Sequence, residues 1–491
     1  MKKNITLSLL ASSLIFSITG LAEDKISQKR TLAGNMNLRY KILPEDVDSF
    51  YNMFANGITY GRLRMNTFKW DWAKDKAGTD NYAMGLGGSL VFKTGRLNGI
   101  SATVGLYTSQ NPFLTMDKDD MGSLKAGKDT LSRNNVKETG SYGMTVLAQS
   151  YIQYDVSKTT VKFGRQIFHS VFTKSNDTKM IPNTFDGLTL ESKDFLNSKF
   201  QLAYFQAQKL RDHTGSHDVI TFKDSSGTSW ANNDDSAIHK GLTFANFKSA
   251  GESTNHNLII ATAENKSVKN LKAVVSYLAV PDVVTNLTFE AHYKMKARGW
   301  SITPGFRYMM QNDAGGGEIG GASLTGKVSN SNSAGYKNPD SLNSSLFAGR
   351  IVGQNKAKTL KLLYGYSKIA DEADIVAPWR GFPTGGYTRA MAQYNWTANT
   401  VTNMVQASYN FGKAGMIEGF RSTVRYAIMD FDEAKKNVSA DRTIIHIDFW
   451  KTFKSIPNFE TKVRIGMVDS ESGDKTDTSY NEYRLEFNYL F

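Results

Sequence analysis

Lysine and arginine side chains recur at alternate positions of several segments, where their charge could attract or bind anions. Consecutive side chains of a β-strand point to opposite faces, so cations two residues apart share one face. A row of like charges along a low-dielectric wall concentrates its field and draws in ions of the opposite sign. The cations placed on such a face are Arg62, Arg64, Lys361, Arg421, Arg425, Lys462, Arg464 and Arg484. Glu460, Glu482 and Glu486 lie in the same register, so the sequence leaves open whether the cations face water or form salt bridges.

Two further segments carry charges among Pro, Gly and aromatic residues rather than along a strand. Pro and Gly favour a fixed path that is not a strand. We therefore expect two loops that fold into the interior and form a charged constriction, the alternative being two exposed loops. The first loop, residues 168–185, holds Lys174, Asp177 and Lys179, and the second, Ala377–Arg389, holds Arg380 and Arg389.

Catalytic and cofactor chemistry finds less support in the sequence. His169, Ser170 and Asp177 are the residue types of a catalytic triad, but nearness in sequence does not establish triad geometry. No G-x-S-x-G or H-E-x-x-H motif occurs, and the chain has no Cys. The G-x-G-x-x-G match at residues 315–320 lacks a following helical pattern, so it predicts a loop. We expect no catalytic residue, no metal site and no cofactor.

The segments that carry the cations read as strands of a membrane barrel. In the last eleven residues Tyr483, Leu485, Phe487, Tyr489 and Phe491 occupy every second position, over about the length a tilted strand needs to cross a bilayer. Similar alternation recurs along the chain, and a tight turn at 94–99 joins two such segments. Short turns alternate with long polar segments, an asymmetry typical of outer-membrane barrels. The long segments are 110–141, 213–255, 312–343 and 370–399.

Length, composition and charge agree with one large barrel. Residues 1–22 read as a secretory signal peptide, 23–57 as an N-terminal periplasmic segment with a short helix near 48–55, and 58–491 as the barrel. At roughly 26 residues per strand and connection, we expect a closed antiparallel barrel of about 18 strands, with 16 as the next choice. The net charge of +13 is scattered, without a nucleic-acid-binding motif, so we expect no nucleic-acid partner.

Several segments resemble the OprD-type porin family, in particular its branch among epsilonproteobacterial major porins. The matching segments are 48–50 with 61–64, Gly-Arg-Gln at 164–166, 176–187, 209–212 and 370–389. The resemblance implies a barrel, usually of 18 strands, that admits small solutes, often carboxylates or amino acids, and an inward third loop at 168–185. Lys179 stands where the family often has Arg, and Lys lacks the bidentate fork that binds carboxylates.

The function expected from these features is an outer-membrane porin for passive diffusion of small hydrophilic solutes, mildly preferring anions, carboxylates or amino acids. A barrel hydrolase and a plugged adhesin or structural barrel remain the alternatives. The expected partners are outer-membrane lipid and lipopolysaccharide, small-molecule solutes, and the barrel-assembly machinery through the strand that ends at Phe491. The sequence leaves open whether the protein is a monomer or a homotrimer.

Overall fold

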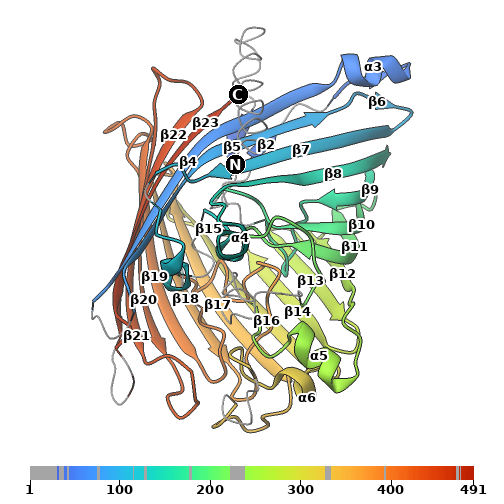
Figure 1. Cartoon of the computed structure of the whole chain (residues 1–491). Helices are drawn as coiled ribbons and strands as arrows, with labels where there is room; N and C mark the ends of the chain where they lie inside the picture. The colour runs from blue at the N-terminus through green and yellow to red at the C-terminus, as the bar shows by residue number, and fades with distance from the viewer. Residues whose placement is uncertain are drawn as a thin grey trace.

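A closed antiparallel β-barrel makes up most of the structure (Figure 1). A computed structural model of the chain describes residues 30–32, 38–40, 44–73, 78–113, 115–125, 130–175, 180–221, 238–326, 333–391, 394–470, 475 and 477–491. Within these ranges the barrel has 18 long strands, which confirms the expected fold and strand number, and the choice of 16 is wrong. The long strands are β4 (Ile58–Trp72), β5 (Asn81–Lys93), β7 (Ile100–Gln110), β8 (Met144–Val156), β9 (Thr159–Gln166), β10 (Thr184–Ser192), β11 (Ser198–Lys209), β12 (Leu258–Asn265), β13 (Leu271–Val280), β14 (Val284–Tyr293), β16 (Trp300–Asp313), β17 (Ser344–Asn355), β18 (Leu360–Ile369), β19 (Val401–Asn410), β20 (Phe420–Asp430), β21 (Arg442–Thr452), β22 (Phe459–Ser470) and β23 (Tyr480–Leu490).

Several short elements accompany the barrel. They are the strands β1 (Arg30–Leu32), β2 (Leu38–Tyr40), β3 (Asp46–Val47), β6 (Arg96–Leu97) and β15 (Met295–Ala297), the helices α3 (Phe50–Ala55), α4 (Arg133–Thr139), α5 (Phe244–Ala250) and α6 (Gly316–Gly320), and the 3-10 helix η3 (Asp119–Ser123). The expected helix before the first strand is confirmed by α3, whose Ser49 side chain accepts a hydrogen bond from the Asn52 amide. The prediction of a loop at 315–320 is wrong, because this segment forms the single turn α6. In the described part of the chain, every helix is too short or too polar to cross a bilayer.

The barrel closes between its last and first long strands. β23 pairs with β4 from Tyr480 opposite Trp72 to Leu490 opposite Arg62. Phe491 extends this pairing, because it exchanges backbone hydrogen bonds with Gly61 at 3.0 and 3.2 Å. Closure leaves no open sheet edge, so the backbone groups of these strands are satisfied within the sheet.

The two ends of the barrel differ in the length of their connections. Short turns join β5 to β7, β8 to β9, β10 to β11, β12 to β13, β14 to β16, β17 to β18, β19 to β20 and β21 to β22. These turns, α3 and the C-terminus share one end, at the top of Figure 1, and α5 and α6 lie at the other end among the long loops. The turn expected at 94–99 is confirmed at the short-turn end, with Asn98 and Gly99 both at positive φ.

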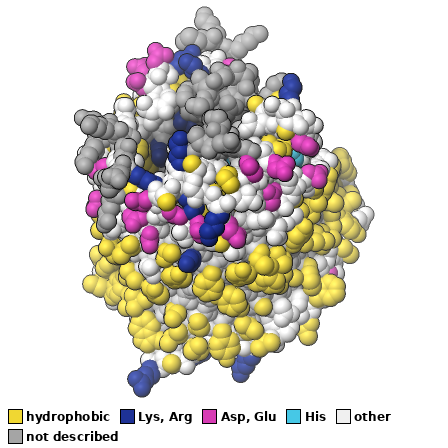
Figure 2. Space-filling view, turned by 90° about the horizontal axis from the view of Figure 1, so that it is seen from below, with side chains coloured by type: hydrophobic (Ala, Val, Ile, Leu, Met, Phe, Trp, Pro, Cys, Tyr) yellow, Lys and Arg dark blue, Asp and Glu magenta, His cyan; other side chains and the backbone are white. Residues whose placement is uncertain are grey.

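The two faces of the barrel wall differ as the alternation predicts. On β23 Tyr483 is 41% exposed on the outer face, while Glu482 and Glu486 on the inner face are 0% exposed. On β18 Tyr364 points outward, while Gly365 and Ser367 face inward, against the loop inside the barrel. Figure 2 shows the hydrophobic side chains gathered in one broad band, with charged side chains above it and a few Lys or Arg side chains at its lower edge. The barrel therefore presents an apolar belt to its surroundings and a polar wall to its interior.

Candidate functional site

A cavity of about 600 Å³ lies inside the barrel, and most of the charged residues that line it are cations. Its charged lining consists of Lys174, Arg211, Lys272, Arg307, Arg380, Arg389, Arg425, Arg464 and Arg484, against Glu264 and Glu290. Because the cations outnumber the carboxylates, the cavity has a positive potential that attracts anions.

Two loops meet inside the barrel and contribute side chains to this cavity. They are the β9–β10 loop, residues 167–183, and the β18–β19 loop, residues 370–400. Thr173 and Arg380 form an isolated antiparallel β-bridge. Next to it the Lys174 amide donates to the carbonyl of Trp379 at 3.1 Å. The structure thus brings together the two loops that the sequence proposed separately, and Lys174, Arg380 and Arg389 all line this cavity.

A glycine allows the two loops to approach this closely. The Gly381 amide donates to the Phe172 carbonyl at 2.8 Å. A Cβ atom at position 381 would lie 2.1 Å from the Phe172 carbonyl carbon, so another residue would push the loops apart. The backbone at Arg380 has φ +71°, a left-handed conformation that a non-glycine residue holds only where its surroundings enforce it.

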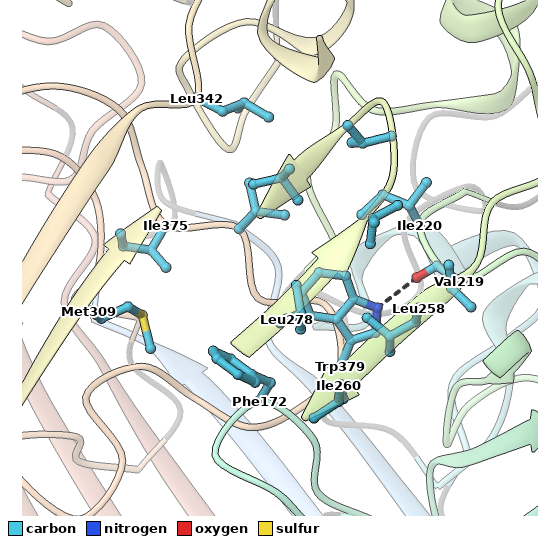
Figure 3. Packing of buried hydrophobic residues seen from close by; sticks show 14 of the residues in the cluster. Phe172, Val219, Ile220, Leu258, Ile260, Leu278, Met309, Leu342, Ile375 and Trp379 are labelled. Atoms are coloured by element: carbon cyan, nitrogen blue, oxygen red, sulfur yellow. Dashed lines mark hydrogen bonds between the residues drawn. The ribbon is translucent and has the colours of Figure 1, made fainter. Parts of the chain in front are cut away.

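Trp379 anchors the junction of the loops in a hydrophobic cluster (Figure 3). Its indole N–H donates to the Val219 carbonyl at 2.8 Å. Phe172 of the β9–β10 loop and Ile260 of the barrel wall belong to the same cluster. Burial of such aromatic side chains contributes strongly to packing, so the neighbouring residue Arg380 is held in a fixed position.

Wall residues bind the β18–β19 loop on its other side. The Arg307 guanidinium donates to the Pro383 carbonyl, and that of Arg350 donates to the Gly386 carbonyl at 2.7 Å. Gly365 of β18 lies under the loop, and a Cβ there would come within 2.2 Å of the Tyr387 carbonyl oxygen. The loop therefore lies against the wall because charged donors hold it and a glycine leaves room for it.

The cations that the two loops contribute to the cavity are partly desolvated. The guanidinium of Arg389 stacks 3.7 Å from the Phe382 ring centre, and that of Arg380 lies 5.9 Å from the same centre. Burial, together with the charge of Arg307, lowers the pKa of Lys174 to about 8. Lys174 is therefore a cation at neutral pH that loses its charge in mildly alkaline solution.

Along the strands many of the predicted cations have carboxylate partners. Asp448 accepts from Arg464 at 2.7 Å and from Arg425 at 3.0 Å. The remaining pairs are Arg64 with Glu486 at 3.8 Å, Arg421 with Glu460 at 3.6 Å, and Arg484 with Glu482. The salt bridges that the sequence left open are thus present, and the excess of cations over carboxylates arises at the loops.

The other predicted residues fall into three groups. Arg62, Arg64 and Lys462 are buried in the inner face of the wall, and Lys361 and Arg421 line a second cavity of about 370 Å³ nearer the short turns. Asp177 and Lys179 lie outside the described residues. The sequence reasoning missed Arg211, Arg307 and Arg350. Alternation with Phe306 and Tyr308 was a signal for Arg307, whereas nothing local identifies Arg350 as a loop anchor.

The candidate nucleophile Ser170 is part of a tight turn. Its hydroxyl lies 2.9 Å from that of Thr173 and accepts the Phe172 amide hydrogen at 3.1 Å. The His169 ring bonds to Ser175, not Ser170, in the hydrogen bonds of the described residues. Within those residues, no three His, Asp or Glu side chains gather as metal ligands do.

Comparisons with known proteins give one consistent result. The family model described as outer membrane porin, OprD family, matches residues 116–491. The fold is similar to that of OpdK of Pseudomonas aeruginosa with vanillate, with TM-score 0.64 and 13% identity over 89% of this chain and 99% of that chain. OccK9 (OpdG) of Pseudomonas aeruginosa matches with TM-score 0.66 and 16% identity over 90% of this chain and 99% of that one. OccAB4 of Acinetobacter baumannii matches with TM-score 0.68 and 15% identity over 89% of this chain and 98% of that chain. No curated protein matches the sequence.

Proposed function

The chain belongs to the OprD family of outer membrane porins, and from this premise we propose that it is a passive channel that favours anions at a cationic constriction. It is an outer-membrane barrel that admits small solutes, as the sequence predicted. The short-turn end is accordingly periplasmic and the long-loop end extracellular. What we propose beyond this is the preference for anions and the residues that produce it.

The observation that carries the proposal is the lining of the central cavity, where nine Lys or Arg side chains face two Glu side chains. An anion that enters this region meets guanidinium and ammonium groups in a low-dielectric setting, where their attraction is stronger than in water. Positioned cations of this kind bias which solutes pass, and the width between the loops limits their size. No covalent step is needed.

Small carboxylates are the proposed preferred solutes. A guanidinium binds a carboxylate through two parallel hydrogen bonds, and Arg389 and Arg464 both reach the cavity. The similar barrel OpdK was crystallised with vanillate, an aromatic carboxylate. Because Lys174 and Lys179 offer only point charges, we propose a graded preference for carboxylates rather than strict exclusion of other solutes.

Permeation into proteoliposomes tests this preference. Benzoate, benzamide and benzylamine have nearly the same size and differ in charge. We expect benzoate to enter faster than benzamide, and benzamide faster than benzylamine, at pH 7 and low ionic strength. Equal rates for all three, with leakage through empty liposomes subtracted, would contradict the proposal.

The two rival functions make different predictions. Members of this family are porins, which are not enzymes, and we propose that this chain has no hydrolase activity. An esterase activity of the purified protein that Ser170→Ala abolishes would favour the enzyme. A barrel that inserts into bilayers without conducting would favour the plugged adhesin.

The partners follow from the location in the outer membrane. The apolar belt contacts membrane lipid, and small solutes pass through the interior. We propose that the barrel-assembly machinery recognises β23 through Phe491, so that Phe491→Ser would slow insertion in cells while leaving the refolded barrel conductive. Cross-linking in intact membranes would decide between a monomer and a homotrimer, which would give a band of three protomers.

A further inference from the structure

A small hairpin near the N-terminus is separate from the barrel sheet. Its strands β1 and β2 pair antiparallel, from Arg30 opposite Tyr40 to Leu32 opposite Leu38. They form a two-stranded sheet of their own, and in the described part of the chain neither strand pairs with a strand of the barrel. Contacts other than strand pairing must therefore hold the hairpin in place.

The stacking of Tyr40 shows on which side of the barrel wall the hairpin lies. The Tyr40 ring stacks on the ring of Tyr60, with 4.8 Å between the ring centres and 14° between the ring planes. Tyr60 shares one face of β4 with Arg62 and Arg64, which belong to the inner wall, and it is 5% exposed. The Tyr40 ring therefore lies in the lumen and not against lipid.

Leu38 and Tyr40 both pack against one cluster of buried side chains inside the barrel. Its members come from the inner faces of β4, β5, β7 and β8 and from the β9–β10 loop, which also carries Lys174. They are Tyr60, Val91, Tyr107, Met144, Val146, Ala148, Met180 and Ile181. The hairpin thus contacts the same cluster as one of the two loops that line the central cavity.

The chain is fixed at the periplasmic end of the barrel just after the hairpin. There β3 pairs in parallel with β6, in the turn between β5 and β7. The Arg96 amide donates to the Glu45 carbonyl at 2.9 Å, and the Arg96 guanidinium donates to the Asp46 carboxylate at 2.8 Å. These contacts hold residues 45–46 at the periplasmic rim, and the hairpin that precedes them lies inside the barrel.

The hairpin is too small to keep its fold away from this cluster. Each of its strands has three residues, and an isolated two-stranded hairpin is marginally stable at best in water. Leu38 and Tyr40 are only half-buried where they dock. A stacked aromatic pair changes an equilibrium by roughly 2- to 10-fold beyond the burial of its area. Docking of the hairpin is therefore weak enough to be reversible.

We propose that the β1–β2 hairpin is a plug, which lowers the conductance of the channel while it is docked beside Tyr60 and restores the full conductance when it detaches. A segment that occupies part of a water-filled lumen displaces water and ions from it, so fewer ions pass. This inference rests on the proposed channel function, because a plug changes the current only of a barrel that conducts.

Single-channel recording in planar bilayers tests the plug with the full chain and with a variant that lacks residues 25–43. For the wild type we expect two conductance levels, a lower one with the plug docked and a higher one with the plug detached. The deletion variant should show only the higher level. It retains residues 23–24, so that the predicted cleavage site after residue 22 is unchanged.

Substitutions of Tyr40 test the docking contact while every residue of the barrel stays in place. We expect Tyr40→Ala to keep both levels and to raise the occupancy of the higher level relative to the lower one by roughly 2- to 10-fold or more. Tyr40→Phe keeps the ring and should behave as wild type. The matched control is Tyr51→Ala in α3, since Tyr51 is 78% exposed and outside the cluster, and it should leave the ratio unchanged.

A tether between the hairpin and the wall tests the docked state directly. The chain has no Cys, so in Tyr40→Cys/Tyr60→Cys a short cleavable cross-linker between thiols can join only these two positions within a chain. We expect a cross-linked product within one chain and channels that stay at the lower level. Cleavage of the linker should restore the higher level.

Two results would overturn the plug alone. One is a deletion variant that conducts at the same levels as the wild type. The other is a failure of Tyr40→Cys/Tyr60→Cys to cross-link although each single cysteine variant reacts with a maleimide. A wild type and a deletion variant that both insert and pass no current would overturn the proposed function together with the plug. Where the deletion variant does not insert, the Tyr40 variants and the cross-link decide.

Discussion

The backbone amide of Lys174 donates a hydrogen bond to the carbonyl of Trp379, at 3.1 Å. This bond joins two loops that are far apart in the chain, and Lys174 and Arg380 both line the central cavity. The proposed constriction therefore involves both loops, and we expect changes in either loop to alter it.

Reversing two charges at the proposed constriction should shift the ion selectivity of the channel from anions toward cations. We expect Lys174→Glu/Arg389→Glu to shift the reversal potential in a KCl gradient toward cation selectivity, because the change of four charge units acts at the narrowest region. Lys158→Glu/Lys454→Glu makes the same change at periplasmic turns, at residues that line neither inner cavity, and should shift the potential much less. Equal shifts for both variants would remove the two loop residues from the constriction.

Anion selectivity should fall as the pH rises from 7 to 9. Burial lowers the pKa of Lys174 to about 8, so this lysine is charged below that pH and neutral above it. Loss of a cation from the cavity weakens the attraction for anions. In Lys174→Met we expect lower selectivity at pH 7 and little further change up to pH 9. A wild-type profile that is flat over this range, measured as reversal potential, would show that Lys174 does not face the permeating ions.

Displacing the β18–β19 loop should change conductance. A Cβ at Gly365 would lie 2.2 Å from the Tyr387 carbonyl oxygen, so Gly365→Val forces the loop away from the wall. We expect an altered single-channel conductance and more frequent current fluctuations. Gly349→Val on the adjacent strand introduces the same side chain on the lipid-facing side, and it should leave the conductance at the wild-type value.

The packing of the extracellular loops around Asp374 should be more stable against local unfolding at mildly acidic pH. The Asp374 carboxylate accepts hydrogen bonds from the amides of Leu324 and Ala398 at 2.8 and 2.7 Å and from the Tyr336 hydroxyl at 2.8 Å. Burial nevertheless raises its pKa to about 6 from the ordinary 3.8. The folded loops thus bind a proton more tightly than the unfolded ones, so stability decreases as the pH rises through 6.

Hydrogen exchange can measure this dependence. We expect the opening free energy at the Leu324 and Ala398 amides to be about 1 kcal/mol higher at pH 5 than at pH 7, after correction for intrinsic exchange. Asp374→Asn, which cannot titrate, should show the same opening free energy at both pH values. Greater protection at pH 7 than at pH 5 in the wild type would contradict the assignment.

The barrel was predictable because its signal is local. Each long strand must separate lipid from water, so alternation such as Glu482, Tyr483, Arg484, Leu485 appears directly in the sequence. The lengths of the connections likewise predicted which end of the barrel is periplasmic, with short turns, and which is extracellular, with long loops.

The way the two inner loops meet was predictable only in part, because it depends on contacts between residues far apart in the sequence. Lys174, Arg380 and Arg389 could be identified as loop cations, but the bridge between Thr173 and Arg380 depends on tertiary packing around Trp379. The anchoring role of Arg350 depends on Gly386 lying within reach, and no spacing in the sequence encodes that distance. The same holds for Gly365, whose small size matters only because Tyr387 lies above it.

The most direct test of a cationic constriction is the zero-current potential of single wild-type channels in a planar bilayer with a tenfold KCl gradient. We predict open channels whose reversal potential has the sign of chloride preference at pH 7. Channels with the sign of potassium preference under the same conditions, or a barrel that inserts and passes no current, would contradict the account.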